Sequence, residues 1–165
     1  MTASEKLAQN ASQICMYAEK VYLLVNDATG FSLPTKTPAI EMIVNGKNIG
    51  LSAAFNIGMK RAFEQGFTEA ILFDQDSFLE HEIFTLLLSE YKAARAKSRV
   101  MCAGPSLCVY GKNLPTPKWT LKKNPVAFEH MDSVKNVITS GMIVNIADAL
   151  SIGSFDENYP VHFCD

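Results

Sequence analysis

The sequence predicts an α/β fold in which strands and helices alternate along a single domain, residues 1–165. One observation is that short apolar runs, such as 21–25, alternate with longer segments whose apolar residues recur at helical spacing. Another is that 48% of the 165 residues are hydrophobic, which is enough to build a core. This alternation is typical of a mostly parallel sheet with helices on both faces.

Each expected element has its own local signal. Strands are predicted from short apolar or β-branched runs that end in polar turns, at 21–25, 40–44, 70–73, 100–103 and 134–139. Helices are predicted from amphipathic spacing, at 4–20, at about 51–64, from an N-cap near Ser77 to about Lys97, and at 146–152 with Asn145 as its cap. A long functional loop is expected from 104 to about 132, and a turn at Ser140 and Gly141.

Charge and composition exclude several classes of protein. Fifteen basic and 17 acidic residues leave a net charge of −2, which gives no general attraction for nucleic acid. The chain contains no run of about 18 apolar residues, so we expect no transmembrane segment and a cytoplasmic protein. The four cysteines are far apart and form no CxxC pair, which argues against structural zinc and a disulfide scaffold.

Polar residues follow the predicted strands at the end where open α/β sheets bind ligands. Helix N-termini and irregular backbone converge there. The residues in question are Asn26, Asp27, Asn45, Asn48, Asp74, Asp76 and Ser140.

The sharpest of these signals is Asp74-Gln75-Asp76, directly after a buried strand. Two carboxylates at a strand end repel each other and lose solvation, and a metal ion or a ligand rich in hydrogen-bond donors compensates for both effects. Mg²⁺ and Mn²⁺ prefer hard oxygen ligands and often share them with substrate phosphates, so a nucleoside diphosphate site fits. The alternative is that Asp74 ends the strand while Asp76 helps Ser77 to cap the next helix.

A second signal is the segment from Asn48 to Gly58, NIGLSAAFNIG. Gly50 permits close approach of the backbone at a helix start, and the small residues after it leave room for a flat ligand. The alternative is a glycine turn before a tightly packed helix. The chain has neither GxGxxG nor GxxxxGK[ST], which argues against a dinucleotide dehydrogenase and a P-loop enzyme.

Six motifs in order resemble the signature of the family-2 glycosyltransferases. They are LLVNDATG, NIGLSAAFNIG, ILFDQDS, GPSL, ITSGMIV and IGSFDEN, followed by Asp165. The resemblance extends from about residue 7, in the first predicted helix, to the end of the chain. The DQDS segment resembles the sequence that is typical of the rhamnosyltransferase branch of that family. The resemblance implies a GT-A fold, a Rossmann-like sheet of nucleotide-diphospho-sugar transferases.

The resemblance also implies roles for individual residues. Nucleotide-sugar contacts would come from Asn26 or Asp27 near the base, from Asn48, Gly50 and Asn56, and from Asp74 near the ribose. Ser140 and Gly141 would line the donor sugar or the acceptor, Asp76 would bind the metal, and Asp165 would be the general base. The family has Asp-Asn-Gly-Ser where this chain has Asn26-Asp27-Ala28-Thr29.

The implied activity is metal-assisted, inverting transfer of a sugar, with rhamnose as one candidate, from dTDP-rhamnose or a UDP-sugar. The acceptor would be a glycan or a lipid-linked acceptor in polysaccharide biosynthesis, and the inner face of the membrane is one candidate location for the cytoplasmic protein. The alternative is a non-catalytic nucleotide-sugar-binding or assembly module. The family has a further strand before the helix at 4–20, so we interpret the chain as a domain truncated at both ends and expect weak or no activity from it alone. Homo-oligomer formation stays open.

Overall fold

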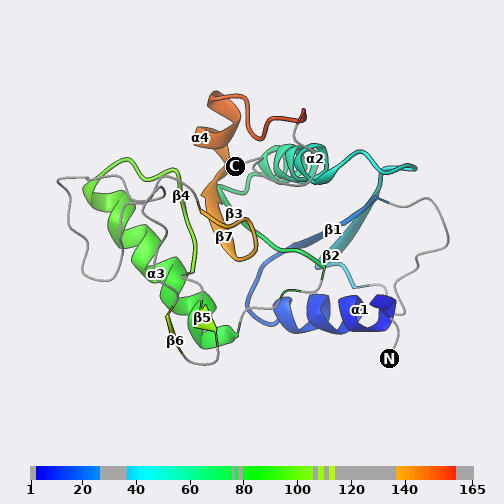
Figure 1. Cartoon of the computed structure of the whole chain (residues 1–165), viewed down its shortest axis with the longest axis horizontal. Coiled ribbons are helices and arrows are strands. Elements are labelled where there is room, and N and C mark those ends of the chain that lie inside the picture. Colours follow the sequence, from blue (N-terminus) through cyan, green and yellow to red (C-terminus); the bar gives the residue numbers. More distant parts are fainter. Residues whose placement is uncertain are drawn as a thin grey trace. The chain divides into compact units, whose positions relative to one another are not determined.

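The computed structural model describes residues 3–26, 37–75, 77, 80–105, 108–109, 112–113 and 137–158. The helices in these ranges are α1 (Ala3–Ile14), α2 (Leu51–Glu64), α3 (His81–Lys97) and α4 (Ile146–Ser151). The strands are β1 (Val21–Val25), β2 (Ile40–Val44), β3 (Glu69–Leu72), β4 (Cys102–Ala103), β5 (Cys108–Val109), β6 (Lys112–Asn113) and β7 (Met142–Asn145) (Figure 1). The predicted α/β class is therefore confirmed at this level.

The chain forms two compact units, and each is described by itself. The first contains the described residues of Met1–Ala70 and of the segment from Ile146 onward, and the second contains those of Ile71–Asn145. Within the described ranges, none of the helices combines the length and the apolar character needed to cross a membrane.

The first unit is built on the parallel pair β1 and β2. Their register runs from Val21 opposite Ile40 to Val25 opposite Val44, so both strands end at the same level. Figure 1 shows α2 on one side of this pair and α1 on the other. Both strands and α2 have the bounds that their sequence patterns predict.

Helix α2 packs closely against β1 through Gly58. A Cβ atom at this position would lie 3.0 Å from Leu24 Cδ1, so the missing side chain lets the strand residue lie against the helix backbone. The same helix buries its apolar stripe, which includes Ala54, Phe55, Met59 and Ala62. The close approach explains why a glycine occupies a helical stripe in which it has poor propensity.

Glu41 on β2 links both strands to the end of α2. Its Oε1 accepts a hydrogen bond from Arg61 Nε at 2.7 Å, and its Oε2 accepts one from Gln65 Nε2 at 2.9 Å. Lys20 Nζ lies 3.4 Å from Oε2, and Tyr22 donates its hydroxyl to Gln65 at 2.6 Å. The donors at Gln65 and Arg61 hold the pKa of Glu41 at about 2, well below its usual 4.5.

The second unit contains a sheet in the order β3-β7-β4, in which β4 and β7 are antiparallel. Its core consists of the buried residues Leu87, Tyr91, Ala103 and Ile143. Tyr91 donates its hydroxyl to the carbonyl of Met101 at 3.0 Å, which ties α3 to the segment entering β4. The pair β1 with β2 is therefore parallel, whereas β4 with β7 is antiparallel, and a mostly parallel sheet is not among the confirmed features.

The strand predicted at 134–139 is wrong in its described part. Residues 137–139 are not a strand, and the strand of this region, β7, follows the turn at Ser140 and Gly141 instead of preceding it. The four residues of β7 are all buried, whereas Ile138 is 44% exposed. The buried Met-Ile-Val run after the turn therefore forms the strand, and the apolar residues before the turn do not.

The start of α3 also differs from the prediction. Ser77 does not cap the helix, because its backbone N–H closes a turn onto the carbonyl of Asp74 at 3.1 Å and α3 begins at His81 after Glu80. Helix α1 is shorter than the predicted helix at 4–20, because it ends at Ile14 and not near residue 20. Its last turn tightens, with Tyr17 N–H bonded to the carbonyl of Ile14.

Smaller differences concern strand bounds and the loop after β4. Strand β3 starts and ends one residue before the predicted 70–73, and β4 is limited to Cys102 and Ala103. The predicted loop contains a short antiparallel pair, β5 with β6. Residues 106–107, 110–111 and 114–132 of that loop lie outside the described residues.

Replacing Glu41 by glutamine should lower the melting temperature at pH 7, because the basic and amide donors lose their carboxylate. The pKa of Glu41 is depressed in the folded state, so the ionised side chain stabilises the fold above about pH 4.5, and this stabilisation disappears as the pH falls towards 2. Thermal unfolding from pH 7 to pH 2 should show the difference between wild type and Glu41→Gln closing in that window.

Glu64→Gln is the matched control, because Glu64 lies 3.9 Å from Arg61 with its side chain 51% exposed. A control variant that loses as much stability as Glu41→Gln would contradict the role assigned to the β2 carboxylate.

Ile143→Ala should destabilise the second unit by about 2–5 kcal/mol, because a fully buried side chain leaves a cavity beside Tyr91. Ile138→Ala removes the same atoms from a residue that is 44% exposed and should change stability much less. Urea unfolding of both variants measures the difference. Equal losses would show that Ile143 is not the core residue that its burial indicates.

Candidate functional site

The ends of β1 and β2 bring two predicted polar positions into contact. Asn45 Nδ2 donates to Asn26 Oδ1 at 2.8 Å, and Asn26 Nδ2 donates to the carbonyl of Gly50 at 3.0 Å. The backbone N–H of Asn45 also bonds to the carbonyl of Val25 at 3.0 Å. These amides connect both strand ends to the start of α2, as the parallel register predicts.

The start of α2 depends on the backbone of Gly50. This residue has φ 86° and ψ 165°, a conformation that strongly favours glycine, and its N–H donates to Asn48 Oδ1 at 3.0 Å. Gly50, the N-cap residue, makes no side-chain cap hydrogen bond, and no acidic residue lies in the first turn of α2. N–H groups and the helix dipole at such a start favour an anionic ligand. Contact of Asn48 and Gly50 with a nucleotide stays a prediction from the sequence.

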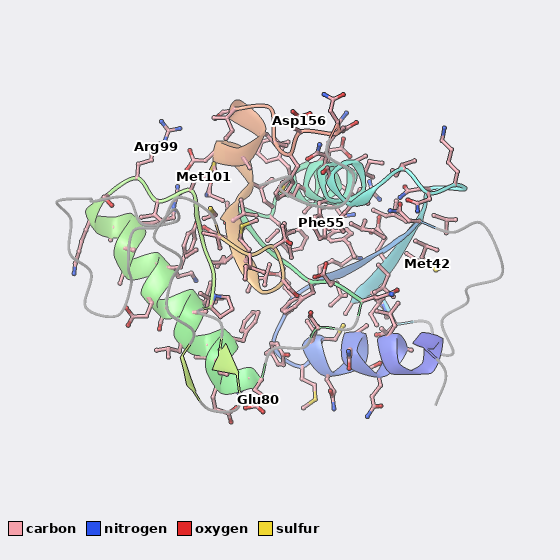
Figure 2. All side chains as sticks on the ribbon, viewed as in Figure 1. Met42, Phe55, Glu80, Arg99, Met101 and Asp156 are labelled. Carbon is pink, nitrogen blue, oxygen red and sulfur yellow. The ribbon has the colours of Figure 1, made fainter. Side chains whose placement is uncertain are left out.

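Asn56 lies in the middle of α2 and binds the segment that follows α4. Its Oδ1 accepts from the N–H of Phe155 at 3.0 Å, and its Nδ2 donates to the carbonyl of Phe155 at 2.9 Å and to Glu157 Oε1 at 3.0 Å. The ring of Phe155 packs against Phe55 with centroids 5.9 Å apart. Figure 2 labels Phe55 on α2 and Asp156 in the segment beyond α4.

In the second unit, three predicted site residues lie together. The N–H of Asp74 is 3.5 Å from Ser140 Oγ, and the N–H of Gly141 donates to the carbonyl of Leu72 at 2.7 Å. Gly141 has φ 85°, and Asp74 is half-buried. The turn at 140–141 is therefore joined to the end of β3, beside the first carboxylate of the DQD motif.

Three predicted residues lie outside the described residues: Asp27, Asp76 and Asp165. Among the described residues, no group of three or more His, Cys, Asp or Glu side chains is placed to hold a metal ion. The proposed metal ligand and the proposed base therefore remain predictions from the sequence.

Sequence reasoning did not predict the partners of Asn56. It named Asn56 as a nucleotide contact and assigned no role to Phe155 or Glu157. The available signal was the motif IGSFDEN itself, whose phenylalanine and acidic residues recur beside α2. Asn45 was placed at the correct strand end, but its bond to Asn26 follows only from the observed register.

Comparison with known proteins finds a relative of this chain. The sequence is 29% identical over 153 residues to the dTDP-rhamnosyl transferase RfbF of Shigella flexneri, which covers 87% of this chain and 50% of the relative. The chain thus spans about half the length of this curated relative. No protein-family model matches the sequence, and no solved structure matches it. The likeness supports a relationship to glycosyltransferases.

Gly141→Ala should cost about 1–2 kcal/mol or more, because an alanine there must adopt a left-handed backbone conformation. Its Cβ would also lie 3.1 Å from Pro105 Cγ. Gly46→Ala is the matched control, since Gly46 has φ 72° but nothing within 4 Å of an added Cβ. Chemical unfolding should therefore show a larger loss for Gly141→Ala, and equal losses would argue against a packed turn at the end of β3.

Proposed function

We propose that this chain is the nucleotide-sugar-binding part of a glycosyltransferase that uses a nucleoside-diphosphate sugar as donor. The observation that carries the proposal is the similarity to a dTDP-rhamnosyl transferase over 153 residues. The strand-end contacts among Asn26, Asn45 and Gly50 support it, as do those among Leu72, Asp74 and the 140–141 turn. dTDP-rhamnose is the first candidate donor and a UDP-sugar the second.

The proposed fold is of the GT-A type, a mostly parallel, Rossmann-like sheet with helices on both faces. Its support is the parallel pair β1 and β2, with α2 beginning shortly after the second strand ends. Ligands in such sheets bind beyond the carboxyl ends of the strands. Asn26, Asn48 and Gly50 occupy that end in the first unit, and Asp74 follows β3 in the second.

In the proposed reaction, Asp165 removes a proton from the acceptor hydroxyl as its oxygen attacks the anomeric carbon of the donor. The bond from that carbon to the diphosphate oxygen breaks, and its electron pair leaves with the nucleoside diphosphate. A single displacement of this kind inverts the configuration. A positioned base supplies typically about 10²–10⁴-fold in rate.

A divalent cation, Mg²⁺ or Mn²⁺, would neutralise the charge that develops on the leaving diphosphate. The oxygen-only chemistry of Asp74 and Asp76 fits such a cation, since both metals prefer carboxylate and phosphate oxygens. We assign Asp76 as the ligand and Asp74 to the ribose. Ser140 and Gly141 would line the donor sugar or the acceptor, a glycan or lipid-linked glycan at the cytoplasmic face of the membrane.

A second candidate function is a non-catalytic module that binds a nucleotide sugar. The observation that favours it concerns Asn26, which stands where the family of the resemblance has an aspartate. The side-chain amide of Asn26 is hydrogen-bonded to Gly50 and Asn45. Binding of dTDP is expected of both candidates, so binding alone does not separate them.

Calorimetry and product release together separate the two candidates. The wild-type chain should bind dTDP more tightly with Mn²⁺ than without it, and Asp76→Asn should remove that dependence, because it replaces the proposed ligand with a weaker one. Asp165→Asn should keep the dTDP affinity but abolish the weak release of dTDP from dTDP-rhamnose that is expected of the chain alone.

The control is Lys60→Ala, on an exposed part of α2. Tight dTDP binding with no release by the wild type would favour the binding module. Absence of binding would contradict both candidates.

A further inference from the structure

The two residues after β4, Gly104 and Pro105, lie beside the chain that leads into the 140–141 turn. A Cβ atom on Gly104 would lie 2.5 Å from Val137 Cγ1 and 3.5 Å from the carbonyl oxygen of Ile138. Gly104 does not have a positive φ, so this position requires the absence of a side chain and not a special backbone conformation. The glycine therefore lets the two segments approach each other closely.

Pro105 lies beside the turn itself. A Cβ atom on Gly141 would be 3.1 Å from Pro105 Cγ and 3.3 Å from its Cδ. Gly141 in turn donates its N–H to the carbonyl of Leu72, at the end of β3, at 2.7 Å. The segment 104–105 therefore approaches both residues 137–138, which lead into the turn, and Gly141 within it.

The half-buried side chain of Ser140 lies beside the end of β3. Its Oγ is 3.5 Å from the backbone nitrogen of Asp74. This distance is long for a hydrogen bond, so the hydroxyl keeps its capacity to donate to a ligand and to accept from one. A ligand group at Ser140 is thus close to any group at Asp74. The donor sugar is joined covalently to its nucleotide, whereas the acceptor is a separate molecule, so this proximity favours the donor as the ligand of Ser140.

We propose that Ser140 contacts the donor sugar and that Gly104 and Pro105 are the positioning residues that hold it there. The inference rests on the proposed function, which leaves both the donor sugar and the acceptor open as ligands of the 140–141 turn. A side chain at position 104 would displace Val137. Because a β-branched residue has few rotamers available, the displacement would pass to the backbone that leads into the turn. A hydroxyl moved in this way loses the geometry that its hydrogen bond needs.

The test measures the affinities of dTDP-rhamnose and of dTDP by calorimetry, in the presence of Mn²⁺. Ser140→Ala should weaken dTDP-rhamnose by about three- to tenfold, the value of one hydrogen bond, and should leave dTDP within about twofold. Gly104→Ala should show the same pattern, although position 104 touches no ligand. In the double variant Gly104→Ala/Ser140→Ala the two losses should not add, because both changes remove the same contact.

Val137→Ala provides a rescue, because it removes the Cγ1 atom that a Cβ on Gly104 would meet. Gly104→Ala/Val137→Ala should therefore bind dTDP-rhamnose within about twofold of Val137→Ala alone. Amide hydrogen exchange at Gly141, whose N–H is bonded to Leu72, should be faster by about tenfold in Gly104→Ala and slow again in the rescued pair. Pro105→Ala removes the ring beside Gly141 and should also weaken dTDP-rhamnose selectively, which keeps the test decisive if Gly104→Ala does not fold.

Several results would overturn the inference. If the wild type binds dTDP and Ser140→Ala leaves the affinity for dTDP-rhamnose unchanged, Ser140 is not a donor contact, and the proposed function stands without this inference. Additive losses in Gly104→Ala/Ser140→Ala would show that Gly104 does not act through Ser140. Equal weakening of both ligands by Gly104→Ala would identify a general structural defect. Absence of dTDP binding by the wild type would contradict the proposed function itself, and this inference with it.

Discussion

The parallel register of β1 and β2 is the constraint on which the first unit depends. Because Val25 lies opposite Val44, the two strands end together, and the asparagines that follow them meet. One of those asparagines then holds the carbonyl of Gly50, at the point where α2 begins. A shift of one residue in this register would turn each side chain of β2 to the other face and would separate Glu41 from α2.

Helix α2 is held at three levels along its length. Asn26 bonds Gly50, the N-cap before its first residue. Asn56 in its middle bonds Phe155, and Glu41 bonds Arg61 and Gln65 at its end. Each level uses a different chemistry: a neutral amide, an amide with an aromatic pair, and a carboxylate. The helix therefore contacts both the strand ends and the segment after α4, although the two lie far apart in sequence.

The sequence predicted well those elements whose signal is local. The bounds of β1, β2 and α2 follow from apolar runs that stop at polar turns, and the structure confirms them. The strand β7 was misplaced because two apolar segments flank the same turn, and only tertiary burial distinguishes Met142–Asn145 from the residues before Ser140. The start of α3 was misplaced because Ser77 has the residue type of a cap but its N–H closes a turn instead.

In the candidate site too, some contacts could be predicted from local sequence patterns and others could not. The contact of Asp74 with Ser140 could be predicted only in part, because Asp74 follows β3, where polar groups of such sheets gather, whereas Ser140 precedes β7 instead of following a strand. The partner of Asn56 could not, because no periodicity in α2 indicates which residues a hundred positions away will lie against it. Local patterns identify the polar residues of a site. Which distant residue each of them contacts depends on the tertiary path of the chain.

Ser154 gives the turn after α4 a particular thermodynamic character. A non-glycine residue with φ 62° costs on the order of 1 kcal/mol in steric strain, and that cost is recovered only while Phe155 stays bound to α2. Detachment of the ring, loss of the amide bonds and relaxation of the serine backbone therefore favour one another. The segment should open and close as one cooperative unit, at a free energy below that of global unfolding.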